Sequence, residues 1–199
     1  LFDHNIQNEI SGLYNTFQKN PSPEAIDSTF ATLVTLNMLN TRYIIYSPDA
    51  PPLVNKYEQG NAWFVNQVRT VANADEEIAA VADFNPGSEA IMDVRFSKDI
   101  EGLTLTPDST AKISLNEYRA NYLKYHSITA KEQLAVFSEI FYDKGWQAYI
   151  DNQPVPHFRV NYILRAMRVP AGDHTIEFKF HPSSYFMGEK VSLACSLLL

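Results

Sequence analysis

Three carboxylates lie close together in the second half of the chain, at Glu139, Asp143 and Asp151. Glycoside hydrolysis uses two such acids, roughly 5–10 Å apart across a cleft. Asp143 and Asp151, however, stand at positions typical of turns, where a carboxylate is solvated, and spacing along the sequence does not establish a cleft. We therefore assign no catalytic residue, and we expect the chain by itself to have no hydrolase or transferase activity.

Glu139 is different, because in an extended segment it shares a face with Phe137 and Phe141. Burial of a carboxylate is costly unless it is paired, and an arginine can supply a bidentate partner. Three arginines follow downstream, at Arg159, Arg165 and Arg168. We expect a structural ion pair between Glu139 and one of them. The alternative is that these arginines bind a sugar hydroxyl or a lipid phosphate.

The aromatic residues of the stretch WQAYI, residues 146–150, could stack on a sugar ring. In a strand, Trp146 shares one face with Ala148 and Ile150, whereas Tyr149 points to the other face. This alternation predicts a hairpin with Trp146 buried and residues 151–154 in the turn, and Tyr149 is the more exposed candidate for a ligand. Trp63 is expected to be a core anchor, with contact to a neighbouring membrane portion as the alternative.

Several classes of function lack support in the composition. The net charge is −7, and the 16 Lys and Arg residues are scattered, so a nucleic-acid partner is not expected. The single cysteine, Cys195, excludes a disulfide framework within the chain. The histidines at positions 157, 174 and 181 do not have the spacing of a zinc motif. Motifs such as GxGxxG, the P-loop and GxSxG are missing as well, so we predict no metal and no cofactor.

The first part of the chain, residues 1–94, has the pattern of a small α+β unit. Ser22 and Pro23 predict the start of a helix over residues 23–38. Residues 42–46 read as a short buried strand, residues 62–71 are rich in β-formers, and residues 89–94 form a further strand. Between these last two, Asn73 and Glu76 resemble a capping box at the start of a short helix.

From residue 95 the pattern changes to short strands separated by turn signals, which is typical of an antiparallel β-sandwich of the jelly-roll or galactose-binding-like kind. The expected strands are residues 111–115, 118–126, 134–142, 146–150, 158–169 and 174–180. Residues 134–141 also fit a helical period, but their aromatic and β-branched content favours a strand. The sandwich is expected to end at residue 187.

Residues 188–199 end in an uncharged run, VSLACSLLL. A membrane-spanning helix needs roughly 20 apolar residues. We expect this run to be the first half of a truncated transmembrane segment, and a final core strand is the alternative.

The run SEIFYDKGWQAYIDNQPVPHFRVNYILRAMRVPAGDHTIEFKFHPSSYFMGEKVSL, with LNMLNTRYII and GNAWFVNQVRTVANADEEIAAV upstream, resembles the C-terminal extracytoplasmic region of the YfhO family of multi-spanning bacterial membrane proteins. The resemblance covers most of residues 36–193. It implies a polytopic protein similar to glycosyltransferases that use lipid-linked sugars, acting at the outer face of the cytoplasmic membrane. The catalytic carboxylate of such enzymes is expected in an early loop that this sequence does not contain.

The resemblance therefore implies a non-catalytic extracytoplasmic domain, with the membrane portion of the same chain and a glycan or lipid-linked sugar as partners. Such a domain would position an acceptor glycan or brace the membrane helices. A free-standing carbohydrate-binding module or adhesin domain is the alternative, and the apolar C-terminal run favours the membrane-bound form.

Overall fold

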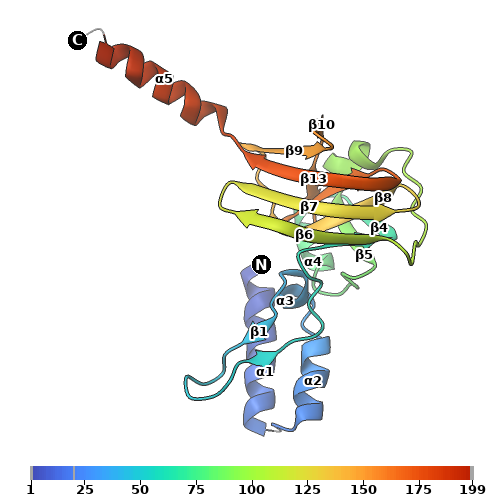
Figure 1. Ribbon diagram of the computed structural model, residues 1–199. Helices are drawn as coiled ribbons and strands as arrows, with labels where there is room; N and C mark the ends of the chain where they lie inside the picture. Colours follow the sequence, from blue (N-terminus) through green and yellow to red (C-terminus); the bar gives the residue numbers. More distant parts are fainter. Residues whose placement is uncertain (1, 20, 198–199) are drawn as a thin grey trace.

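Two antiparallel sheets packed face to face form the centre of the computed structural model, which describes residues 2–19 and 21–197 (Figure 1). The first sheet has five strands in the order β10-β9-β13-β7-β6, and the second has four in the order β11-β12-β8-β3. The five-stranded sheet comprises β6 Lys112–Arg119, β7 Tyr122–Thr129, β9 Trp146–Ile150, β10 Gln153–Val155 and β13 Gly172–Phe180. The four-stranded sheet comprises β3 Ala62–Val65, β8 Gln133–Ile140, β11 Phe158–Val160 and β12 Leu164–Val169. The predicted α+β class with a sandwich-like arrangement is confirmed.

The four-stranded sheet is buried on both faces, and strand β8 shows this most clearly. Ala135 and Phe137 face the five-stranded sheet, where they pack in one core with Phe178. Leu134 and Val136 face the other way, into a second core. A strand covered on both sides needs a continuous apolar run instead of an alternating one. This requirement explains why residues 134–137 also fit a helical period, although the predicted strand is correct.

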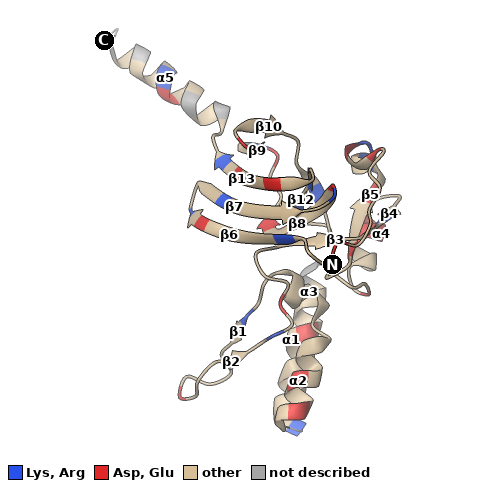
Figure 2. Ribbon diagram, turned by 45° about the vertical axis from the view of Figure 1, so that its right-hand side comes forward, with Lys and Arg blue, Asp and Glu red and all other residues tan. Residues whose placement is uncertain are grey.

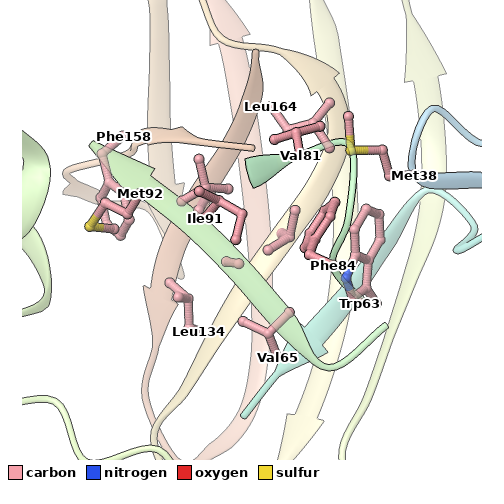
Figure 3. Packing of buried hydrophobic residues seen from close by; sticks show 14 residues of the cluster. Met38, Trp63, Val65, Val81, Phe84, Ile91, Met92, Leu134, Phe158 and Leu164 are labelled. Atoms are coloured by element: carbon pink, nitrogen blue, oxygen red, sulfur yellow. The ribbon is translucent and has the colours of Figure 1, made fainter. Parts of the chain in front are cut away.

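A third layer covers the outer face of that sheet. Strands β4 Gln67–Val71 and β5 Glu89–Asp93 are parallel and are joined by helix α4 Ala74–Ala80. The predicted cap is confirmed, because Asn73 accepts hydrogen bonds from the backbone N–H groups of Asp75 and Glu76. Figure 3 shows Ile91, Val81 and Phe84 from this layer packed against side chains of the sheet.

Residues 62–71 therefore form two strands in different layers, not one. Strand β3 pairs with β8 in the sandwich, whereas β4 belongs to the covering layer. We expected a domain boundary between residues 94 and 95, with the whole sandwich after it. Strand β3 lies before residue 95 but belongs to the four-stranded sheet, so the sandwich contains residues from both sides of that boundary. Trp63 is a core anchor, as predicted: it is buried, and its Nε1 donates to the Pro86 carbonyl at 2.7 Å.

The N-terminal segment forms three helices, α1 Phe2–Lys19, α2 Pro23–Ala31 and α3 Val34–Met38. Helix α1 was not anticipated. The single helix predicted over residues 23–38 is wrong, since it breaks before Val34, although Ser22 does cap α2. The Glu9 carboxylate of α1 accepts from the backbone N–H groups of Thr35 and Leu36, which satisfies the exposed N-terminus of α3 after the break.

The predicted buried strand at residues 42–46 is also wrong. Strand β1 covers only Tyr43–Ile44 and pairs with β2 Leu53–Val54 in a separate two-stranded ribbon. Tyr43, Ile45 and Tyr46 are exposed, because this ribbon lies against the helical unit instead of inside the sandwich.

The C-terminal element is helix α5 Ser183–Leu197, which extends away from the end of β13 (Figure 1). The alternative of a final core strand is therefore wrong, and the sandwich ends before residue 183 instead of at 187. Described side chains such as Met187, Val191 and Leu193 are exposed. Within residues 2–19 and 21–197, no helix combines the length and the apolar character needed to cross a membrane. The final two residues of the predicted truncated span lie outside the described part of the chain.

Candidate functional site

A β-bulge between β8 and β12 lies at one end of the sandwich. Leu164 pairs with Ile140 and the next residue, Arg165, pairs with Phe137, so Ser138 and Glu139 have no partners opposite them. The Arg165 Nε donates to the Ile140 carbonyl at 2.9 Å, and the Ser138 hydroxyl bonds to the carbonyls of two neighbouring segments. Bulges commonly redirect side chains next to functional sites, and here the bulge sets the positions of Glu139 and Arg165.

Arg165 is buried between the two sheets, with 2% of the residue exposed. Its guanidinium carbon lies 4.2 Å from the Trp146 ring centroid and 5.3 Å from that of Phe178. These cation–π contacts offset part of the cost of burying the charge. Burial lowers the pKa of the Arg165 guanidinium from its ordinary value, although an arginine remains protonated at neutral pH.

Glu139 is half-buried at the same bulge, and burial raises the pKa of its carboxyl group, against the opposing effect of the Arg165 charge. The expected ion pair is not formed, because no salt bridge joins Glu139 to an arginine within the described residues. The physical reason is the bulge itself: Arg165 turns toward Trp146 and the Ile140 carbonyl.

Three buried polar atoms around the Phe178 ring have no hydrogen-bond partner among the described residues. They are Arg165 Nη1, the Tyr125 hydroxyl and His157 Nε2. The ring centroids of Tyr125 and His157 lie 6.2 and 5.7 Å from that of Phe178. Burial raises the pKa of Tyr125, whereas burial and then the Arg165 charge lower the pKa of His157 to about 4. At neutral pH the phenol is therefore protonated and the imidazole is neutral.

Tyr125 and His157 were missed as site residues. The signal for Tyr125 was present, since in YLKYHSIT it alternates with polar residues and must face the core together with Leu123. For His157 the sequence carries no comparable signal, because the short strand β11 begins only at the next residue.

Trp146 is half-buried, not fully buried as predicted, because it stands at the end of the sandwich. Its ring covers Arg165 on one side and packs against Phe180 at 5.3 Å between centroids. The preceding Gly145 has φ 136°, and a Cβ there would lie 2.7 Å from Phe180 Cε2. Glycine is thus required for Phe180 to pack beside Trp146.

Trp146 also lines an open cleft of about 410 Å³ at the base of α5. The other lining residues are Asp143, Lys144, Gly145, Gln147, His181, Pro182 and Ser184. The cleft therefore combines one aromatic ring with side chains that can donate and accept hydrogen bonds, which is a combination suited to carbohydrate.

The predicted hairpin is present, but its turn is shorter than expected. Asp151 and Asn152 alone form it, with φ of 49° and 66°, while Gln153 and Pro154 already belong to β10. Two residues with positive φ are typical of a type I′ turn, which suits the twist of a tight hairpin.

The structure separates Tyr149 from Trp146. Tyr149 lies on the outer face of the five-stranded sheet, where its hydroxyl donates to Gln147 and the Lys179 ammonium lies 4.8 Å from its ring centroid. The two aromatic candidates therefore do not form one sugar-binding platform.

The three candidate arginines do not converge either. Arg159 pairs with Glu77, a fully buried residue of α4, and lies near Asp93. Arg168 pairs with Glu132 near the other end of β8. Figure 2 accordingly shows basic and acidic residues interspersed over the strands and helices. Only Arg165 lies with Trp146 and Glu139.

The remaining carboxylates and histidines are also apart. Asp151 binds His174 at 2.6 Å near the hairpin turn, and this contact raises the pKa of the imidazole and lowers that of the carboxyl group. Asp143 and His181 line the cleft at the base of α5. Among the described residues, no three potential metal ligands are grouped together.

If Arg159 is structural, Arg159→Met should lower the free energy of unfolding by about 3–5 kcal/mol, because it leaves the Glu77 carboxylate buried without its partner. Arg168→Met is the matched control, since its pair is partly exposed and should contribute about 1 kcal/mol or less. Urea denaturation at pH 7 measures both. Equal losses for the two variants would show that the Arg159 pair is not the buried structural contact described here.

Residues 105–192 match the model of a family described as bacterial membrane protein YfhO. The matched segment contains strands β6 to β13 and most of α5. It does not include the two upstream sequence segments, beginning at residue 36, on which the resemblance also rested. No curated protein and no solved structure matches the chain. The strand-rich half of the chain is therefore similar to the YfhO family of bacterial membrane proteins.

Proposed function

We propose that this chain is a non-catalytic extracytoplasmic domain of a membrane protein that resembles glycosyltransferases using lipid-linked sugars. Its role is to position a glycan acceptor at the end of the sandwich that carries Trp146. The observation that supports this role most strongly is the cleft at the base of α5, where an indole ring stands among hydrogen-bonding side chains. The similarity of residues 105–192 to a bacterial membrane protein family supports the location.

The arrangement of the cleft suits an extended polymer better than a small enclosed substrate. It is open to solvent, and its polar lining comes from both the β8–β9 connection and the start of α5. A hydrogen bond from the His181 backbone N–H to the Gly145 carbonyl, at 2.7 Å, holds these two segments together. A glycan lying across them would contact α5 at its base, next to the proposed membrane attachment.

The glycan-binding role predicts that Trp146→Ala weakens binding of neutral trisaccharides of glucose or N-acetylglucosamine by about tenfold or more. Truncating an aromatic anchor at the centre of a binding site commonly costs about 2 kcal/mol. Isothermal titration calorimetry on the whole chain measures this, and Tyr149→Ala on the outer face is the matched control. Loss of binding in the control alone would move the site to the outer face, and no binding by the unsubstituted chain would refute the role.

The extracytoplasmic location predicts the behaviour of a cysteine placed in the exposed β8–β9 connection. In the native bacterium, the full-length protein carrying Asp143→Cys, with Cys195→Ser to remove the other thiol of this domain, should react with a membrane-impermeant maleimide in intact cells. Labelling that appears only after lysis would place the domain on the cytoplasmic side. The Cys195→Ser protein without the new cysteine gives the background.

A further inference from the structure

We propose that Arg165, Tyr125 and His157 form a binding site for an anionic group, a carboxylate or a phosphate carried on the sugar ligand. This inference rests on the proposed function, since it specifies the chemistry of the glycan that the domain holds. It starts from the three unpartnered polar atoms around Phe178, two of which belong to residues that are almost completely buried.

Leaving such atoms unsatisfied is expensive. A buried donor or acceptor without a partner costs about 1–3 kcal/mol, and a charged one costs more. More than nine-tenths of buried polar groups in folded proteins are paired. Three unpaired atoms around one phenylalanine ring therefore indicate a place where a group from outside the chain completes the hydrogen bonding.

The donors present define that group. Arg165 Nη1 is a cationic donor, the protonated Tyr125 hydroxyl can donate, and the neutral imidazole of His157 donates when its proton is on Nε2. Each of these donors can bond to an oxygen anion, and charge-assisted hydrogen bonds of this kind are about twice as strong as neutral ones. A neutral hydroxyl would leave the Arg165 charge without compensation.

The positive charge is balanced only in part, by the electrostatic effect of the nearby Glu139 carboxylate. Arg165 acts electrostatically on Tyr125, His157 and Glu139, but it forms no salt bridge among the described residues. The Glu139 carboxylate would repel a bound anion. Glu139 is half-buried at the bulge, and its side chain therefore lies near the surface. Trp146, which covers Arg165, also lines the cleft, so the two parts of the site share one side chain.

The test compares glucose, glucuronate and glucose 1-phosphate as probes, using ¹⁵N NMR of the Arg165 and His157 side chains in the whole chain. We expect saturable shifts with one or both acidic sugars and none with glucose at the same concentrations. The two acidic probes distinguish a carboxylate ligand from a phosphate ligand. Equal shifts with all three sugars would overturn the anion site while leaving the glycan-binding role intact, and no shift with any probe would also overturn it.

Tyr125→Phe should weaken binding of the preferred acidic probe by about tenfold or more, because it removes one hydrogen bond to a charged group. The matched control is Tyr122→Phe on the same strand, whose hydroxyl bonds Glu177 on the opposite face. Since the Tyr125 hydroxyl has no partner among the described residues, the variant should fold normally, which thermal unfolding checks. Unchanged affinity in Tyr125→Phe would contradict the site.

Glu139→Gln provides a second variant, at a half-buried position of the bulge. Removing the opposing carboxylate should strengthen binding of the acidic probe. Weaker binding would mean that Glu139 accepts a hydrogen bond from a ligand hydroxyl, and it would overturn the assignment of this cluster as an anion site.

Discussion

Burial of the four-stranded sheet on both of its faces determines how the other elements are arranged. A sheet with one solvent-exposed face needs only one covering layer. Strand β8, however, places apolar side chains on both faces of the four-stranded sheet. The five-stranded sheet covers one side, and the β4–α4–β5 unit must cover the other. This constraint explains why a parallel strand pair appears in an otherwise antiparallel fold, since a helix crossover joins parallel strands.

The same constraint determines where the sandwich can carry polar groups. In the middle of β8, consecutive residues are buried and apolar. Polar side chains therefore lie at the end of the strand, where the bulge interrupts pairing with β12. Arg165 is held there by one backbone carbonyl and by aromatic rings instead of by a carboxylate. By contrast, the buried Glu77–Arg159 pair ties the covering layer to the sheet and has no unbalanced charge to offer a ligand.

Local patterns predicted most of the strand-rich half. Two expected strands are wrong: residues 158–169 divide into β11 and β12, and residues 118–126 contain the turn between β6 and β7. Alternation in residues 146–150 and the Asp-Asn pair after it predicted a hairpin, and Asn73 with Glu76 predicted the start of α4, because these signals act over a few residues. Local signals failed where a distant contact decides the structure. Glu9 stabilises the start of α3 across 26 residues of sequence, and the division between β3 and β4 depends on pairing with β8, about 70 residues later.

The candidate site was predictable only in part for the same reason. Residue types made Trp146 and Glu139 candidates, together with one of three arginines. Which arginine lies beside them depends on the partners that the other two arginines find. Arg159 finds Glu77 at a separation of 82 residues, and Arg168 finds Glu132 at 36. No periodicity encodes such pairings, and none shows that Arg165 would form no salt bridge among the described residues.

If Arg165 serves a ligand and not the stability of the fold, the free energy of unfolding of Arg165→Met without ligand should not fall below that of the unsubstituted protein. Replacing a buried charge by an apolar side chain of similar volume is often neutral or stabilising. Urea denaturation of the whole chain at pH 7 should therefore show Arg165→Met to be at least as stable as the unsubstituted protein. A loss of about 3–5 kcal/mol would show that Arg165 stabilises the fold, and would contradict the account.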